Sequence, residues 1–126
     1  CTEIDKAFKA FLKCEIDICC NAFIINKVPR YDIHGKRLLE SSEKYYFEDL
    51  GLRNDLTGSN RIGDIEKLIE NAIYLHLKSQ GFAVFVGQLR QMELDLVAKK
   101  NEQTIYVQAT LRICSLAMTS FNIMVL

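Results

Sequence analysis

The 126-residue sequence has one proline, six glycines and no net charge, because sixteen Lys and Arg residues balance sixteen Asp and Glu residues. Collagen-like and low-complexity chains are therefore excluded, and 49% apolar residues fit one ordinary globular domain. Because the charges balance, the chain has no overall positive charge to attract nucleic acid or anionic membranes, and such contacts would need a local basic patch. No apolar run reaches the roughly twenty residues of a membrane helix, and no signal peptide is recognisable. We expect a cytoplasmic protein without membrane contact.

The chain also lacks a glycine-rich phosphate loop and begins at Cys1 rather than Met. These two features predict a piece of a longer protein. Its five cysteines are an odd number without the paired spacing of a structural zinc site, and both histidines stand apart from them. We interpret the cysteines as reduced thiols, some of them buried as small apolar side chains.

Hydrophobic periodicity divides the first half of the chain into helix and hairpin. The predicted elements are one or two helices over residues 4–25, a strand over 22–28, a turn over 29–35, an extended segment over 37–39, a short strand over 45–47, and a loop over 51–63 with a helical turn at 52–56.

The second half predicts a helix followed by an antiparallel meander. Asp64 is a plausible N-cap, and Gly81 stands where a glycine ends a helix. The predicted elements are a helix over residues 64–79, strands over 82–86, 92–99 and 104–111, and one more short helix or strand in the apolar tail.

Three polar residues could carry chemistry if this interpretation holds. Strict alternation places Glu93, Asp95 and Val97 on one face of their strand, so Asp95 is an acid within an apolar strand. Glu70 lies at the edge of the apolar stripe of the helix, and Gln108 lies on the third strand. Glu70, Asp95 and Gln108 could meet at one hard cation, with Mg²⁺ as the candidate cofactor.

This arrangement resembles the restriction-endonuclease-like fold, which has an acid on its first helix, Asp on the second strand and Glu-x-Lys on the third. Here the third strand has Gln108-Ala109-Thr110, so the lysine that orients the attacking water is missing. An active nuclease would have to recruit a lysine from elsewhere, such as Lys78. The alternative is that Asp95 and Glu70 are capped or solvent-paired acids.

Longer motifs resemble the C-terminal domain of a group of prokaryotic AAA-type ATP-binding proteins of poorly defined function. They follow one another in order over about residues 20 to 110: Val28-Pro29-Arg30-Tyr31-Asp32-Ile33, Gly35-Lys36, Lys44-Tyr45-Tyr46-Phe47-Glu48-Asp49-Leu50-Gly51-Leu52-Arg53-Asn54, Ile69-Glu70-Asn71-Ala72-Ile73-Tyr74-Leu75, Glu93-Leu94-Asp95-Leu96-Val97-Ala98 and Tyr106-Val107-Gln108. The resemblance implies an N-terminal ATPase module, a winged-helix-like segment and then this nuclease-like domain. ATP would bind only the absent module.

The resemblance places a basic hairpin where a DNA-contacting wing would lie. Its basic residues are Lys27, Arg30, Lys36 and Arg37. Such a hairpin can contact DNA phosphates, although a solvated charged turn explains it equally well because Asp32, Glu40 and Glu43 dilute the patch.

We therefore predict an α+β protein. Residues 1–50 would form a winged-helix-like remnant of helix and hairpin, and residues 51–126 a nuclease-like domain truncated at its C-terminus. The predicted function is a non-catalytic DNA- or protein-binding domain of a larger AAA-type ATPase. The alternatives are a metal-dependent nuclease with a degenerate site (Glu70, Asp95, Gln108; metal on Glu70 and Asp95) and a structural or homo-oligomerising domain.

Overall fold

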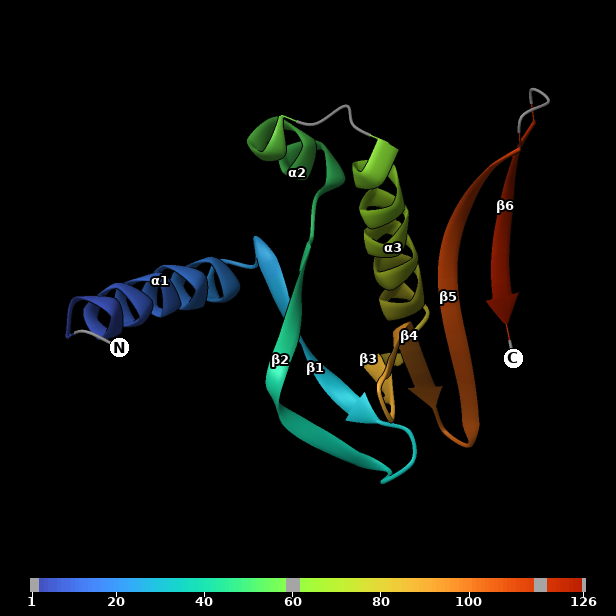
Figure 1. Cartoon of the computed structure of the whole chain (residues 1–126), viewed down its shortest axis with the longest axis horizontal. Helices are drawn as coiled ribbons and strands as arrows, with labels where there is room; N and C mark the ends of the chain where they lie inside the picture. The colour runs from blue at the N-terminus through green and yellow to red at the C-terminus, as the bar shows by residue number, and fades with distance from the viewer. Residues whose placement is uncertain (1–2, 59–61, 115–117, 126) are drawn as a thin grey trace.

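The computed structural model describes residues 3–58, 62–114 and 118–125. Figure 1 shows the elements in order. They are α1 (Glu3–Asn21), β1 (Ile25–Asp32), β2 (Arg37–Phe47), α2 (Leu50–Thr57), α3 (Ile62–Ser79), β3 (Ala83–Leu89), β4 (Met92–Lys100), β5 (Gln103–Cys114) and β6 (Met118–Val125).

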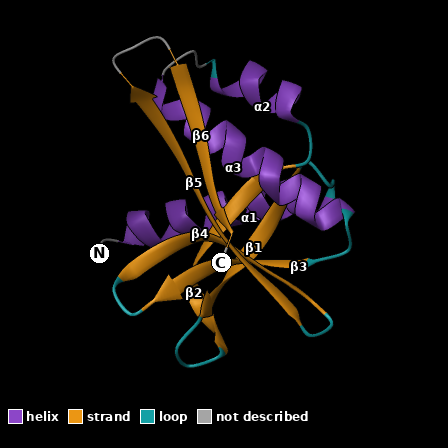
Figure 2. Cartoon of the chain, turned by 90° about the vertical axis from the view of Figure 1, so that its right-hand side faces the viewer, coloured by secondary structure: helices purple, strands orange, loops and turns teal. Residues whose placement is uncertain are grey.

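All six strands form one mixed sheet in the order β2-β1-β3-β4-β5-β6 (Figure 2). The β1–β3 pair is parallel and the other neighbours are antiparallel. The predicted α+β class is therefore confirmed, as are the helix-then-meander order and one further strand in the tail. Because Arg30 of β1 pairs with Val86 of β3, the hairpin and the meander belong to the same sheet. Residues 1–50 and 51–126 are thus joined by backbone pairing.

The hairpin differs from the prediction at two points. The hairpin is confirmed, but the turn predicted over residues 29–35 begins too early: it lies over residues 33–36, because β1 continues to Asp32 and includes Pro29. Proline has no N–H for the ladder, and here it lies at the register shift between Val28 and Arg30, where such a donor is not required. The second strand is continuous over Arg37–Phe47 rather than split into two short segments.

The two helices after the hairpin have recognisable ends. Asp49 caps α2 by accepting a hydrogen bond from the Leu52 N–H at 2.7 Å, and Gly58 ends it in the left-handed region at φ 59°. The predicted long helix is confirmed as α3, although it begins at Ile62 and Asp64 lies in its first turn. Gly81 follows it at φ 83°, as a C-terminal glycine should.

The core lies between α3 and the sheet. Tyr74 and Leu77 of α3 pack on buried side chains from five strands, and Tyr74 stacks on Tyr46 with ring centroids 4.6 Å apart. The buried strand residues are Val28, Tyr46, Val86, Leu96, Ala98 and Val107. This packing fixes α3 across the sheet, and it therefore fixes the helical residue Glu70 relative to the strands.

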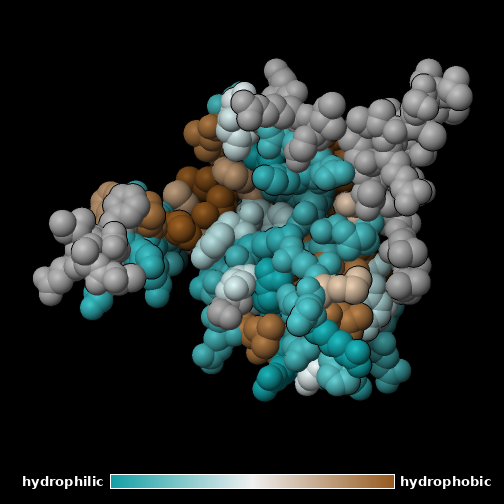
Figure 3. All heavy atoms as spheres, viewed as in Figure 1, coloured by the Kyte–Doolittle hydropathy of each residue, from teal (hydrophilic) through white to brown (hydrophobic). Residues whose placement is uncertain are grey.

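The first helix, α1, projects to one side of the sheet (Figure 1). Phe11, Leu12 and Ile18 on this helix are 60%, 43% and 56% exposed. Figure 3 shows apolar surface in the projecting part of the molecule where Figure 1 draws α1. Among the described residues, no helix is both long and apolar enough to cross a membrane.

Gly87 in β3 leaves no room for a side chain. A Cβ atom there would lie 2.7 Å from Leu94 Cβ, 2.9 Å from Val97 Cγ2 and 3.3 Å from the Leu94 carbonyl oxygen. We expect Gly87→Ala to lower the free energy of unfolding by about 2 kcal/mol, because β4 cannot retreat from β3 without losing pairing. Urea denaturation would measure the loss. Gly51→Ala, in the first turn of α2, is the control: its Cβ would meet the Asp49 side chain at 3.1 Å but no backbone, so a smaller loss is expected, and equal effects would contradict the steric argument.

Candidate functional site

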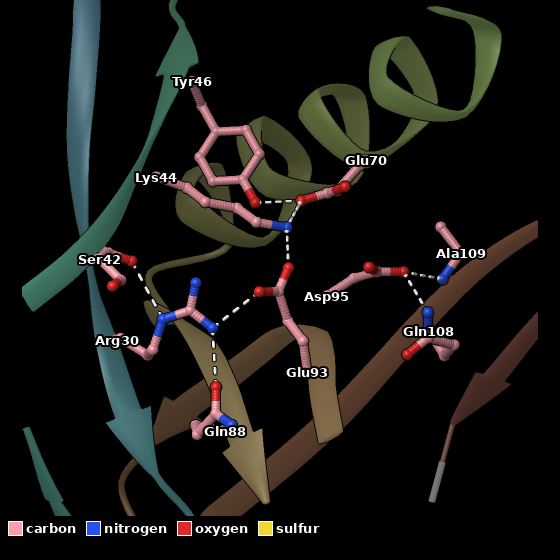
Figure 4. A network of polar contacts seen from close by, with 10 residues as sticks. All are labelled: Arg30, Ser42, Lys44, Tyr46, Glu70, Gln88, Glu93, Asp95, Gln108 and Ala109. Carbon is pink, nitrogen blue, oxygen red and sulfur yellow. Dashed lines mark hydrogen bonds and ion pairs between the residues drawn. The ribbon is translucent and has the colours of Figure 1, made fainter. Parts of the chain in front are cut away.

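A network of charged and polar side chains continues the core face of the sheet (Figure 4). Lys44 and Gln88 each lie two positions along their strand from a core residue, Tyr46 and Val86 respectively. Side chains two apart in a strand share a face, so these polar groups lie beside the core and are only partly solvated. The network residues are Arg30, Ser42, Lys44, Tyr46, Glu70, Gln88, Glu93, Asp95, Gln108 and Ala109.

Lys44 connects the helix to the meander. Its Nζ lies 3.2 Å from Oε1 of Glu70 on α3 and 2.6 Å from Oε1 of Glu93 on β4. The Tyr46 hydroxyl donates to the same oxygen of Glu70. The ammonium therefore lies between two carboxylates from different elements.

Arg30 binds the second carboxylate oxygen of Glu93. Its Nη1 lies 2.7 Å from Glu93 Oε2 and 2.8 Å from the Gln88 amide oxygen, and its Nε donates to the Ser42 carbonyl at 3.0 Å. Only 13% of the Arg30 side chain is exposed. This arginine is therefore committed to the network.

The ion pairs shift the proton affinities of their members. Desolvation lowers the pKa of Lys44, but hydrogen bonds to Glu93 and Glu70 outweigh it and raise that pKa above its usual value. Desolvation likewise opposes ionisation of Glu93, yet the bonds from Lys44 and Arg30 hold its pKa below normal. Burial and the bond to Glu70 raise the pKa of Tyr46. These groups stay in their ordinary charge states at neutral pH.

A β-bulge brings Asp95 to the same side as Glu70. Phe85 of β3 pairs with Val97, whereas Gly87 pairs with Leu94, so Asp95 and Leu96 both face one residue of β3. Leu96 belongs to the core beneath α3, and the charge of Glu70 acts on Asp95 from α3. The strict alternation that we expected for this strand is therefore wrong here.

Asp95 marks the point where β4 and β5 stop pairing. Their ladder ends at Leu96–Val107, and the next residue, Asp95, accepts from the Ala109 N–H at 2.7 Å and from Gln108 Nε2 at 2.8 Å. Both bonds go to Oδ2. The carboxylate thus replaces a backbone acceptor at the divergence of the strands.

Asp95 is ionised at an energetic cost. Desolvation is the main cause that raises its pKa, and the charges of Glu70 and Glu93 add to it, whereas the bond from Ala109 and the charge of Lys44 oppose it. An acid with a raised folded-state pKa destabilises the fold increasingly as pH rises through that pKa. Two cations, Arg30 and Lys44, face three carboxylates here, and Asp95 is the acid left without an ammonium or guanidinium partner among the described residues.

We expect Asp95→Asn to raise the free energy of unfolding at pH 7 by about 1 kcal/mol. The asparagine Oδ1 can accept both bonds now made to Oδ2, while the buried charge and its repulsion from Glu70 are removed. The gain should shrink as pH falls through the folded pKa of Asp95, because the wild-type acid then becomes neutral. Denaturation at pH 7 and at pH 4 would measure this difference, and a loss of stability at pH 7 would contradict it.

The predicted metal ligands come together only in part. Glu70 bonds to Lys44 and Tyr46, whereas Asp95 belongs to a neighbouring group of contacts with Gln108 and Ala109 (Figure 4). In that group Gln108 offers its amide nitrogen to Asp95. In the part of the chain that the structure describes, no three His, Cys, Asp or Glu side chains form a group able to hold a metal ion. The Thr110 side chain lies outside the described residues. Lys78, the lysine suggested as a recruit, instead pairs with Glu48 and Asn26.

The four hairpin bases do not form one free basic patch. Lys27 lies 3.0 Å from Glu43, and Arg30 is held in the network. Arg37 lies 3.9 Å from Asp32.

The sequence prediction missed Lys44 and its contacts. Its signal is the two-residue spacing of Lys44 and Tyr46 in a strand whose tyrosine is buried, a spacing that places both on the core face. That signal is usable only once β2 is recognised as a single strand from Arg37 to Phe47.

Comparison with known proteins gives one relative of uncharacterised function. An uncharacterized protein of Haemophilus influenzae is 36% identical over 98 residues, which are 78% of this chain and 24% of that protein. The chain thus spans about a quarter of the relative's length. No family model matches the chain, and no solved structure matches it.

Proposed function

We propose that this chain is a non-catalytic binding module of a larger AAA-type ATPase, built on a restriction-endonuclease-like scaffold that follows a winged-helix-like segment. The observation that carries the proposal is the position of Lys44, whose ammonium occupies the space between Glu70 and Glu93. Asp95 is likewise engaged by Gln108 and Ala109. The acids that a nuclease would offer to a cation are therefore satisfied from within the chain.

The relative's length supports a module within a longer protein. The aligned region is only 24% of that protein, so most of the relative lies outside the part shared with this chain. In line with the motif resemblance, we propose that the parent protein of this chain carries an ATPase module, and that ATP binding belongs to that module alone.

Protein contact is favoured over DNA contact. Three of the four hairpin bases have carboxylate neighbours, so few charges remain to release counterions from DNA. In contrast, α1 exposes Phe11, Leu12 and Ile18 on a helix that projects from the sheet (Figure 3). We assign this surface to contact with the ATPase module of the parent protein.

Calorimetric titration of Mg²⁺ and Mn²⁺ into the chain tests the non-catalytic role. We expect no saturable heat at millimolar metal and no cleavage of plasmid or oligonucleotide DNA. Saturable binding that Asp95→Asn removes would overturn the proposal.

A photo-crosslinker at position 11 of the parent protein should reach the ATPase module, whereas one at Lys9, at a different angle around the helix, should not. A crosslink to DNA or to a second copy would contradict that contact.

The metal-dependent nuclease stays as a second candidate because of Lys44 itself. Lys44 supplies, from β2, an ammonium near Glu70 and Glu93. It could replace the lysine of the Glu-x-Lys motif, which is missing from Gln108-Ala109-Thr110. In that case a cation would bind Glu70 and Asp95, and Lys44 would orient water beside it. Manganese-dependent cleavage that is lost in Lys44→Met and partly retained in Lys44→Arg would favour this candidate. Absence of cleavage in the wild-type chain would exclude it.

A further inference from the structure

We propose that the cavity between β2, α2 and α3 binds a phosphoryl group, with Arg53 as its principal ligand. The cavity has a volume of about 410 Å³ and is lined by residues of all three elements. It lies beside the network of Figure 4, with which it shares Lys44, Tyr46 and Glu70. The proposal does not depend on the binding role assigned above.

Arg53 is the principal ligand because it is a buried charge that forms no ion pair within the described part of the chain. The residue is 7% exposed and lies in the middle of α2. Its one side-chain hydrogen bond among the described residues goes from Nη1 to the neutral amide oxygen of Asn54, at 3.3 Å. A guanidinium has five N–H donors, and a buried arginine is ordinarily paired with a carboxylate.

The remaining donors of Arg53 are not sealed in the protein. Among the described residues, the buried side-chain nitrogen or oxygen atom without a partner is Asn26 Nδ2, and no nitrogen of Arg53 is in that state. Because Arg53 is one of the residues that line the cavity, we place these free N–H groups toward it. An anion that entered the cavity would receive charge-assisted hydrogen bonds from them.

The other charges of the lining favour an anion. Lys67 of α3 contributes a second cation, while Lys44 and Glu70 neutralise each other at 3.2 Å. Among the described lining residues, Asp64 is the one remaining carboxylate, so Arg53 and Lys67 leave a net positive charge there. The fork of arginine matches two oxygens of one phosphoryl group, and a lysine on another element reaches a third.

The size of the cavity points to more than an isolated ion. A volume of about 410 Å³ falls within the usual range for small-molecule sites, whereas a phosphate ion fills only part of it. Three consecutive residues of β2, Tyr45, Tyr46 and Phe47, also contribute to its lining. A phosphate monoester larger than the free ion, such as a nucleoside monophosphate, fits this combination of charge and volume.

Calorimetry and thermal denaturation with inorganic phosphate, AMP and a short oligothymidylate test the proposal at constant ionic strength. We expect saturable binding of at least one of these probes and a matching rise in melting temperature, with sodium chloride as the control. Binding of phosphate and AMP would identify a monoester ligand, and binding of the oligonucleotide alone would identify a nucleic-acid backbone. No saturable binding of any of the three probes would overturn the proposal.

Variants separate this cavity from general charge attraction. Arg53→Met should weaken binding at least about tenfold, and Lys67→Gln should weaken it about threefold. Lys9→Gln removes an exposed lysine of α1 and should leave affinity unchanged. Equal affinities in wild type and Arg53→Met would overturn the proposal. If Arg53→Met fails to fold, unchanged affinity in both Lys67→Gln and Arg53→Lys would do so.

Discussion

Replacement of Asn71 by alanine should lower the free energy of unfolding by about 3 kcal/mol, because two backbone groups lose their partner in a buried site. The Asn71 side chain accepts from the Phe47 N–H at 2.9 Å and donates to the Phe47 carbonyl at 2.8 Å. Asn71 is 2% exposed, so water cannot replace these bonds without a rearrangement. The amide thus ties the last residue of β2 to the middle of α3.

A graded variant distinguishes hydrogen bonding from packing at this position. Asn71→Asp keeps an oxygen that accepts from the Phe47 N–H but cannot donate to its carbonyl, and it adds a buried charge at neutral pH. At acid pH the protonated aspartic acid can donate again, so the stability of Asn71→Asp should rise relative to that of Asn71→Ala as pH falls. Thermal denaturation should show a drop of roughly 10 °C for Asn71→Ala. A drop below about 2 °C would mean that the Phe47 peptide finds other partners.

The fold was predictable from sequence where the signal is local. The apolar stripe and terminal Gly81 predict α3, and turn residues predict the antiparallel order of β3, β4 and β5. The hairpin boundaries failed because Pro29 was interpreted as a turn residue, whereas a register shift accommodates it inside β1. Whether a strand can tolerate proline depends on how the adjacent strand pairs with it, and a single sequence does not show that pairing.

The sequence predicts only those site residues whose positions follow from the helix or strand that carries them. The charge of Glu70 acts on Asp95, and Asp95 reaches this side of the sheet through a bulge that strict alternation omits. Gln108 lies beside Asp95 but as a donor. Lys44 could not be placed because its approach to Glu70 depends on the parallel β1–β3 pairing, a contact between distant parts of the chain.

Lys44→Met should cost about 2 kcal/mol at pH 7, because Glu70 and Glu93 lose an ammonium that lies between them in a half-buried site. The cost is below that of a fully buried pair, since 29% of the Lys44 side chain is exposed and Arg30 still pairs with Glu93. Glu93 has a lowered folded-state pKa, so its contribution is present above the usual 4.5 and is lost as pH falls through the folded value. The difference between wild type and variant should therefore shrink in acid, as chemical denaturation at pH 7 and pH 3 would show.

Lys44→Met also tests whether the Lys44 ammonium keeps a divalent cation from binding the neighbouring acids. Without the ammonium, Glu70, Glu93 and Asp95 face Arg30 alone, and the excess negative charge favours a divalent cation. We expect Mn²⁺ to raise the melting temperature of Lys44→Met while leaving wild type unchanged, with at least about tenfold tighter binding to the variant. Lys78→Met is the matched control, because it removes a lysine paired with Glu48 away from this network and should not create metal binding. If wild type binds Mn²⁺ as tightly as Lys44→Met, the internal ammonium does not block the acids, and the non-catalytic role loses its main support.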